Sequence, residues 1–462
     1  MKPFKEENIM AGMVVKNNMS AINTLNTLNK NHSALSKSLQ KVSSGMRINS
    51  AADDASGYAI SERMRVQIRS LDQDNRNTQN GNSMMKVAEG AVSSTVEILK
   101  TLKEKVINAA NDTNTDSDRQ QIQKELDQSI DQINDNANVT YNGKYLVDGS
   151  HNRRVGTSAE APTDVKTHLT NESLDAKTSW TSKFSDLCNR NGESLNIQST
   201  DMVTISVVNE GKTYTTSFQA NTALSTGFTT KLDEALSGQK KFSASKATGL
   251  ETASSSAEIG MGPSATKVST ADLGTALTLS SKTAGVKGQI SGLTISITDS
   301  NGNINKSANA CLDNFTESIR AQNKSADNAI VLQTGTKANQ AIKIGLTDMR
   351  AQALGLQGAD GSTLNVSTQK NANAAINVLD NAIQKALDQQ TTIGAIESRL
   401  EYTSTNLTTA SENVTASEST IRDADMAKEM TEYTKNNVLL QAAQSMLAQA
   451  NQNSSSVLSL LQ

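Results

Sequence analysis

Apolar residues recur every three or four positions near both ends of the chain, whereas the middle shows short alternating runs. Over residues 13–44 this spacing predicts a helix with one narrow apolar stripe, as in a strand of a coiled coil. Gly45 follows, and glycine readily adopts the left-handed conformation that ends many helices. The stripe, which we expect to pack against other helices, comprises Ile22, Leu25, Leu28, His32, Leu35, Leu39 and Val42.

A second helical segment is expected after Asn49 and Ser50, which are residue types that cap helix N-termini. Further along, Asn142-Gly143 lies between β-forming residues, which predicts a two-residue hairpin turn. The apolar positions of the second segment include a seven-residue repeat at Met85, Val92, Leu99 and Val106, and a shorter stripe at Ile122, Leu126, Ile130 and Ile133.

The C-terminal segment, residues 367–462, has the strictest repeat. Heptads that continue without a break favour a left-handed supercoil over an isolated surface helix. Beyond residue 430 the apolar residues mix with small and amide residues, so this tail exposes apolar groups unless something covers them. The heptad positions are Leu379, Ala386, Ile393, Leu400, Leu407, Val414 and Ile421, and the apolar residues of the tail include Leu440, Met446, Leu447, Val457, Leu458, Leu460 and Leu461.

Residues 151–366, between the helical ends, are rich in Ser, Thr, Ala and Gly. Residues 203–208 and 212–218 flank Asn-Glu-Gly and predict one hairpin, and residues 293–298 before Asp-Ser-Asn-Gly predict another. We therefore expect a mainly α protein with a β-rich insertion. The many hydroxyl side chains are equally compatible with a partly flexible region.

The apolar stripes at the two ends cannot be buried by either end alone. A helix over residues 13–44 would be about 48 Å long and only marginally stable by itself in water. The simplest arrangement folds the chain back, so that the C-terminal helices lie on the N-terminal ones. Neighbouring copies would cover what remains exposed, and head-to-tail contacts then give an open filament. A closed monomeric or dimeric bundle is the alternative.

Composition excludes several classes of function. A net charge of −3 gives no basic surface for nucleic acid. No segment has the roughly 20 apolar residues of a membrane span, and the first ten residues lack the apolar core of a signal peptide. Cys188 and Cys311 are far apart and lack metal-site spacing; they form one bridge outside the cell or remain two small buried residues. Trp180, the only tryptophan, is expected to anchor the core of the insertion.

The sequence resembles the bacterial flagellins at both ends. The N-terminal signature matches residues 43–61, and the C-terminal signatures match residues 393–400, 447–452 and 457–461. The resemblance implies a secreted, non-enzymatic subunit without cofactors that polymerises into the flagellar filament. It also implies an inner coiled-coil domain of residues 13–50 with 421–462, a helical core domain of residues 51–150 with 367–420, and a surface-exposed variable region at 151–366, which is often O-glycosylated.

The same resemblance implies partners. These are further copies of the chain, hook-associated and cap proteins, and an export chaperone on the C-terminal helix that accompanies the chain to the flagellar type III apparatus. Nucleic acid and membrane are not among them. Flagellins usually begin close to a motif that here starts at Met13, so residues 1–12 are extra, and Met13 or Met10 is predicted to be the true start.

One departure from the family pattern lies on the second helical segment. Animal receptors and neighbouring subunits contact many flagellins at a Gln-Arg-Val-Arg-Glu-Leu run, which here reads Lys-Thr-Leu-Lys-Glu-Lys. Loss of an arginine and an apolar anchor should weaken a binding hot spot, which predicts weak or absent receptor activation. The corresponding residues are Thr101, Lys103, Glu104, Lys105 and Glu125.

Three alternatives to a filament subunit are a zinc protease, a hook–filament junction protein and a secreted adhesin. A zinc protease in the insertion would need His-Glu-x-x-His, and His32, His151 and His168 do not have that spacing. A hook–filament junction protein shares the paired terminal helices, but residues 446–452 are more typical of the filament subunit. A secreted adhesin with the same ends remains compatible, and no residue identifies its ligand.

Overall fold

The computed structural model describes residues 18–155, 164–236, 242–248 and 275–460. The proposed start at Met13 or Met10 and the apolar Leu461 lie outside the described residues. The chain divides into two compact units, one formed by Met1–Asn75 with Thr405–Gln462 and the other by Arg76–Ser404. The fold is mainly α-helical with a β-containing middle region, as the sequence predicted.

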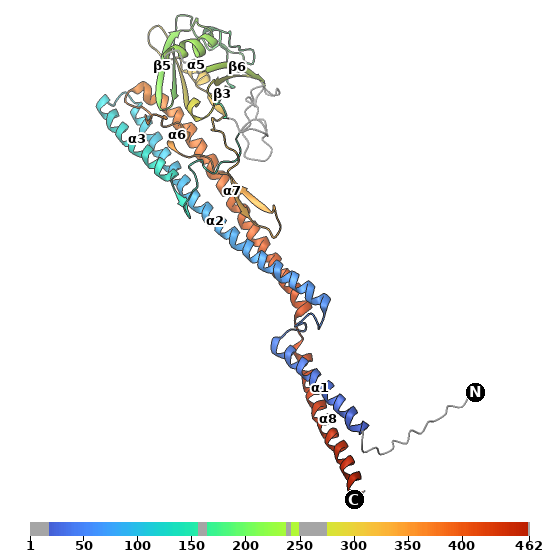
Figure 1. The fold of residues 1–462 in the computed structure, drawn as a ribbon. Coiled ribbons are helices and arrows are strands. Elements are labelled where there is room, and N and C mark those ends of the chain that lie inside the picture. The colour runs from blue at the N-terminus through green and yellow to red at the C-terminus, as the bar shows by residue number, and fades with distance from the viewer. Residues whose placement is uncertain (1–17, 156–163, 237–241, 249–274, 461–462) are drawn as a thin grey trace, which may run out of the picture. The chain divides into compact units, whose positions relative to one another are not determined.

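The first unit contains α1 (Met19–Ser44), α8 (Met426–Leu460) and the adjoining ends of α2 (Ala55–Ala109) and α7 (Gln369–Arg422), and Figure 1 shows α1 and α8 side by side. Asn18 caps α1 by accepting a hydrogen bond from the amide of Ala21 at 3.0 Å. Gly45 ends α1 with a φ of 68°, which confirms the predicted stop.

The predicted caps of the second helix are wrong. Asp54 is the residue that caps α2, because its Oδ1 accepts the amide hydrogen of Gly57 at 2.9 Å. Asn49 and Ser50 lie earlier, in a turn where both of their amides donate to Oδ2 of Asp53. Asp53 therefore closes the turn, and Asp54 starts the helix.

In the second unit, α2, α3 (Asp116–Ala137) and α7 enclose one long apolar core. A capping box starts α3, with the hydroxyl of Thr115 and the carboxylate of Asp118 exchanging hydrogen bonds with each other's backbone amides. The core includes Ile130 and Ile133 of α3, Leu146 and Val147 after the first hairpin, and α6 (Ala351–Leu354).

Two small hairpins lie in this unit. Strands β1 (Thr140–Tyr141) and β2 (Lys144–Tyr145) pair around Asn142 and Gly143, whose φ values of 51° and 75° confirm the predicted turn. Strands β10 (Ile330–Gln333) and β11 (Ala341–Ile344) form the second hairpin, which was not predicted.

The β-rich region contains two antiparallel sheets. One has the order β5-β4-β8, from β4 (Met202–Asn209), β5 (Lys212–Gln219) and β8 (Gly292–Thr298). The other has the order β6-β7-β3-β9, from β3 (His168–Asn171), β6 (Phe242–Thr248), β7 (Thr275–Ser281) and β9 (Phe315–Ile319). Short helices connect them: η1 (Phe184–Asp186), η2 (Thr226–Lys231), α4 (Leu232–Ala235), η3 (Val286–Gly288) and α5 (Lys306–Leu312).

The sheets and the short helices share an apolar core separate from that of the long helices. Trp180 belongs to it and packs edge-on against Phe228, with ring centroids 5.3 Å apart, which confirms its predicted place. Phe184 also stacks on Phe228, with ring centroids 6.1 Å apart. The core of the β-rich region therefore uses few aromatic residues, and these pack against one another.

Both hairpins predicted in this region form, although the second is reduced to a single bridge. Strands β4 and β5 pair around Glu210 and Gly211, as the sequence indicated. Residues 293–298 do form strand β8, but its partner is β4, which lies about 90 positions earlier. The turn after β8 leads back to a single antiparallel bridge between Thr298 and Ile304, and the next residue, Asn305, caps α5 through its side chain.

The outer edge of β8 is occupied by side chains. The amides of Asn381 and Asn377 on α7 donate to the carbonyls of Ser291 and Leu293, both at 2.9 Å. Asp313 and Asn309 accept from the amides of Ile295 and Ile297, at 2.9 and 2.7 Å. Side chains from two helical segments thus stand where another strand would pair.

Candidate assembly interface

The helices α1 and α8 form an antiparallel pair joined by polar contacts along its length. At one end, the side-chain amide of Asn18 donates to the carbonyl of Ala450 at 3.2 Å. In the middle of α1, the side-chain amide of Asn31 donates to the carbonyl of Leu439 at 3.2 Å, and further along that of Asn436 donates to Oγ of Ser38 at 2.9 Å. At the other end, Lys41 and Glu429 form an ion pair at 3.3 Å. These contacts fix the register of the two helices.

The face that each helix turns towards the other is built mainly of small and polar side chains. Ser38 on α1 and Ala443 and Ala450 on α8 are buried. Small residues let two helices approach closely, but they bury little apolar area. The larger apolar residues on this face are half-buried; they are Leu28, Leu35, Val42, Leu440 and Leu447.

The same two helices leave a second set of large apolar side chains in contact with water. Leu39 is 52% exposed and Met446 is 63% exposed, although both occur in the predicted stripes. The apolar stripe of the sequence is thus wider than the contact between α1 and α8. The exposed set comprises Met19, Ile22, Leu25 and Leu39 on α1, and Met426, Met430, Val438, Leu439 and Met446 on α8.

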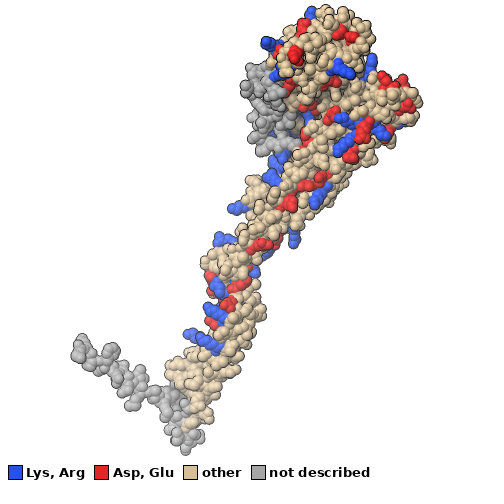
Figure 2. All heavy atoms as spheres, turned by 180° about the vertical axis from the view of Figure 1, so that it is seen from behind, with Lys and Arg blue, Asp and Glu red and all other residues tan. Residues whose placement is uncertain are grey.

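Half of this helix pair has no charged side chain. Residues 18–29 of α1 and residues 436–460 of α8 contain no Asp, Glu, Lys or Arg. Figure 2 shows tan surface without blue or red along that part of the pair. An uncharged surface with large apolar side chains is typical of a face that becomes buried on assembly. Val457, Leu458 and Leu460 lie on α8, but their side chains are outside the described part.

A buried arginine contacts both interhelical connections of the first unit, the one between α1 and α2 and the one between α7 and α8. The guanidinium of Arg422, at the end of α7, donates to Glu62 at 2.6 Å and lies 5.3 Å from the centre of the Tyr58 ring. The same ion pair lowers the pKa of Glu62. The carbonyl of Arg422 accepts the amide of Arg47 at 2.7 Å, and the amide of Ala424 donates to the carbonyl of Gly45 at 2.9 Å. The N-terminal signature, residues 43–61, therefore forms one side of this contact, and residues 422–424 form the other. We call this contact the joint between the long helices.

The predicted heptad residues differ in burial along the chain. In the second unit they face the core: Met85, Val92, Leu99, Val106, Ile393 and Leu400 all have no exposed area. In the first unit the heptad is less covered, because Leu407 is 9% exposed and Val414 and Ile421 are half-buried.

The residues that correspond to the receptor-binding run lie on the second unit, and two of its three lysines pair with acids on other helices. Lys105 pairs with Glu125 of α3 at 3.2 Å, and Lys103 pairs with Asp380 of α7. Thr101 and Glu104 are exposed, and the hydroxyl of Thr101 donates back to the carbonyl of Glu97. The run thus presents ion pairs where the family pattern has an arginine and a leucine.

The described residues contain no cluster of three or more His, Cys, Asp or Glu side chains suited to a metal ion. Cys188 and Cys311 are free thiols in the structure. No helix in the described ranges combines the length and the apolar character that crossing a membrane requires.

Family comparisons match both helical ends of the chain. The model of the bacterial flagellin N-terminal helical region matches residues 15–152, and that of the C-terminal helical region matches residues 376–461. A flagellin of Clostridium tyrobutyricum is 34% identical over 441 residues, which cover 95% of this chain and 99% of the relative. This chain belongs to the bacterial flagellin family. A flagellin of Bacillus subtilis (strain 168) is 29% identical, with 97% of this chain and the whole relative covered.

This flagellin is accordingly a structural subunit of the flagellar filament, outside the cell. The junction-protein and adhesin alternatives are not favoured, because the matched relatives are flagellins over their full length. Among solved structures, the flagellar junction protein FlgL from Legionella pneumophila is 13% identical, with a TM-score of 0.32 and coverage of 79% of this chain and 99% of that one.

Proposed function

We propose that copies of this flagellin build the inner layer of the filament by burying the exposed apolar residues of α1 and α8 against one another. The supporting observation is that both helices, already paired, keep large apolar side chains in water on an uncharged surface. Pairing within one molecule leaves this area uncovered, so association is favoured by the hydrophobic effect. In the sequence, this layer corresponds to residues 13–50 with 421–462.

Asparagine substitutions on the exposed face test this proposal. Leu25 is 45% exposed and Val438 is 59% exposed, so each has about half of its side-chain area left to bury. Full burial of such a side chain contributes ~1.5–3 kcal/mol, so Leu25→Asn or Val438→Asn should remove about 1 kcal/mol per copy. That corresponds to a roughly fivefold higher critical concentration for salt-induced polymerisation.

Lys30→Asn is the matched control, because it places the same side chain at an exposed polar position of α1. Sedimentation and electron microscopy of polymerised protein measure the critical concentration and show the filaments. An equal effect of Lys30→Asn would mean that lower helix propensity is responsible. Normal polymerisation of both apolar variants would overturn the proposal.

We further propose that residues 51–150 with 367–420 form the next layer and that residues 151–366 face solvent. The fully buried heptad positions of α2 and α7 support this role, because a helical core that is complete within one molecule gives neighbouring copies a rigid surface to pack on. A map of the assembled filament would test it directly. Side chains of residues 151–366 at the central channel would contradict it.

Export is proposed to use a chaperone that covers the apolar face of α8, and hook-associated and cap proteins are proposed as partners at the filament ends. The uncovered Met430, Val438 and Met446 are the chemical reason for a chaperone. Co-purification of full-length protein and of a variant lacking residues 421–462 from flagellated cells tests this. A chaperone bound equally to both forms would refute its assignment to α8.

Weak activation of animal flagellin receptors is proposed from the substituted run at Thr101 and Lys105. The ion pairs of Lys103 and Lys105 occupy side chains that would otherwise be free to contact a receptor. A reporter-cell assay tests this, and nanomolar potency would exclude it. The role is proposed to be purely structural, and peptide-bond cleavage by purified filaments would contradict that.

A further inference from the structure

The exposed apolar surface of α1 and α8 is rich in methionine. Four of its nine large apolar residues are methionines, and a methionine sulfur reacts with peroxides, whereas leucine, isoleucine and valine offer no such atom. Their residues are well exposed: Met446 is 63%, Met19 is 62%, Met430 is 46% and Met426 is 43% exposed. A small oxidant in solution can therefore reach all four.

These four methionines lie at both ends of the helix pair. Met19 and Met446 lie near the end that is closed by the side chain of Asn18. Met426 and Met430 lie at the opposite end, one helical turn apart at the start of α8. Oxidation would therefore alter the surface over the whole length of the pair.

The methionines described in the second unit lie in different surroundings. Met84, Met85 and Met349 belong to the helical core and are at most 6% exposed. Met202, at the start of β4, is 37% exposed. The chain thus contains shielded methionines and one accessible methionine away from α1 and α8, and both kinds serve as internal controls.

Oxidation of a methionine by hydrogen peroxide requires no other group of the protein. The sulfur lone pair attacks one peroxide oxygen, so that an S–O bond forms while the O–O bond breaks. The hydroxide that leaves takes up the proton of the transferred oxygen and departs as water. The sulfur loses two electrons and the peroxide gains them, and the product is methionine sulfoxide, which is polar and chiral.

A sulfoxide on this surface opposes assembly. Burial of the thioether is favoured because apolar area leaves water, whereas a buried sulfoxide oxygen needs a hydrogen-bond donor. Residues 18–29 and 436–460 contain no Lys or Arg, so these segments offer no charged donor to a sulfoxide at Met19 or Met446. Leucine would supply similar apolar area without this sensitivity.

We propose that Met19, Met426, Met430 and Met446 are modification sites at which hydrogen peroxide converts the free subunit into a form that does not join the filament. This inference rests on the proposed burial of the same surface between copies. Subunits already in the filament are protected, because the contacts that bury the thioethers also exclude the oxidant. The change is reversible, because methionine sulfoxide reductases restore the thioether.

The first test compares purified full-length monomer with salt-assembled filaments at the same peroxide concentration. Peptide mass spectrometry measures the oxidation rate at each methionine. In the monomer, the four sites should react at least roughly tenfold faster than the core methionines. In filaments, the four sites should react at least roughly tenfold more slowly than in the monomer, whereas Met202 should keep its rate.

The second test measures the critical concentration by sedimentation. Oxidised monomer should need an at least roughly tenfold higher concentration to polymerise. Replacement of all four sites by leucine keeps the apolar area, so this variant should polymerise equally well before and after peroxide. Met202→Leu is the matched control and should leave the sensitivity of wild type unchanged.

Met446→Gln tests the same idea without an oxidant and without the fourfold variant. Glutamine places a polar oxygen on an unbranched side chain of similar length, as the sulfoxide does. This variant should raise the critical concentration roughly fivefold, and Met202→Gln should leave it unchanged.

Reduction separates the methionines from the two free thiols. Methionine sulfoxide reductases with dithiothreitol should restore polymerisation of the oxidised monomer. Dithiothreitol alone should not restore it, because this reagent reverses disulfides and sulfenic acids of Cys188 and Cys311 but leaves sulfoxides in place.

The outcomes distinguish this inference from the proposed function. Oxidised monomer that polymerises at the wild-type concentration, although its four sites are protected in filaments, overturns this inference alone. Equal oxidation rates in monomer and filament overturn the proposed burial and this inference together. Peroxide sensitivity that persists in the leucine variant, or recovery with dithiothreitol alone, also overturns it, because another group would then be responsible.

Discussion

The contact between strand β8 and helix α7 allows a sharp prediction from two glycine substitutions. An alanine Cβ at Gly292 would lie 2.6 Å from Cγ2 of Val378, 3.0 Å from the backbone nitrogen of Val378 and 3.4 Å from the carbonyl oxygen of Ala374. A side chain can rotate away, but the helix backbone cannot yield without displacing α7. At Gly394, on the same helix, an added Cβ meets nothing within 4 Å.

The two changes should therefore have opposite signs. Overpacking a tight contact costs about 1–3 kcal/mol, so Gly292→Ala should lower the free energy of unfolding by that amount. Gly394→Ala adds no contact and removes backbone freedom from a helix interior, so it should raise the free energy of unfolding by ~0.5–1 kcal/mol.

Urea denaturation followed by the fluorescence of Trp180 measures the first effect, because this tryptophan lies in the core of the β-rich region. Far-UV circular dichroism follows the helices in the same samples. With a slope of about 2 kcal/mol per molar urea, Gly292→Ala should move the fluorescence midpoint down by ~0.5–1.5 M. A Gly292→Ala midpoint at or above that of wild type would refute the packing argument, and so would equal shifts for both variants.

Three other substitutions test separate features. Burial lowers the pKa of His168 from 6.5 to about 4, so the folded protein loses stability as the pH falls from 6.5 towards 4. The full shift corresponds to about 3 kcal/mol, of which roughly 2 kcal/mol develops between pH 7 and 4.5, and His168→Gln should remove this part of the difference between urea titrations at the two pH values. Arg422→Lys should weaken the joint between the long helices, seen as faster amide hydrogen exchange at Arg47, and unchanged exchange there would contradict the role of the guanidinium. Arg119→Ala should cost about 2–3 kcal/mol, because the buried guanidinium donates to the carbonyl of Ala109 at the end of α2 and to that of Asn111 just beyond it. A loss below about 0.5 kcal/mol by thermal or urea unfolding would show that water replaces the guanidinium.

Features set by neighbouring residues could be predicted from the sequence. The turns at Asn142-Gly143 and Glu210-Gly211 formed because adjacent residues provide the positive φ values that such hairpins require. The stop at Gly45 has the same local origin. The long helices followed from the regular spacing of apolar residues over many turns.

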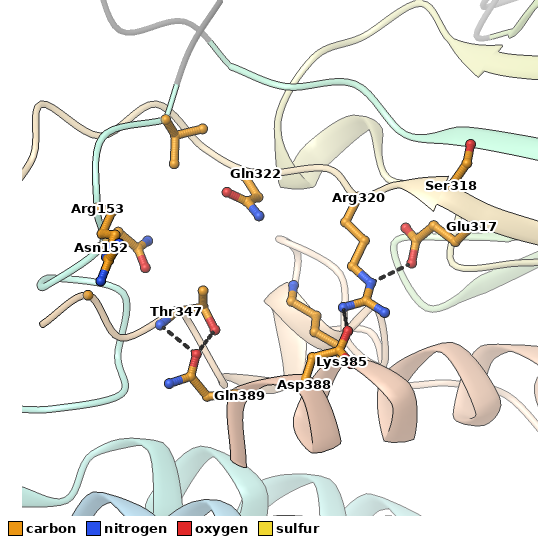
Figure 3. A pocket seen from close by; sticks show the side chains of 12 residues that line it. Asn152, Arg153, Glu317, Ser318, Arg320, Gln322, Thr347, Lys385, Asp388 and Gln389 are labelled. Atoms are coloured by element: carbon orange, nitrogen blue, oxygen red, sulfur yellow. Dashed lines mark hydrogen bonds and ion pairs between the residues drawn. The ribbon is translucent and has the colours of Figure 1, made fainter. Parts of the chain in front are cut away.

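Features that join distant segments could not be predicted. The partner of β8 is determined by packing on α7 and on β4, and no signal within residues 293–298 indicates either. The apolar stripe of α1 did not reveal which of its residues face α8, because small and polar side chains such as Ser38 form much of that contact. Glu317 and Lys385 are unremarkable in the sequence, and only the fold buries both of them beside one pocket (Figure 3).

The outer edge of β8 has a consequence for a protein that accumulates in very many identical copies. A free strand edge offers the same strand of the next molecule a template, and sheets that grow in this way become amyloid-like aggregates. Here Asn377, Asn381, Asn309 and Asp313 already satisfy the backbone of that edge within the molecule. The chain can thus be synthesised and stored at high concentration with this route to irreversible self-association closed, while its long helices remain free for ordered growth.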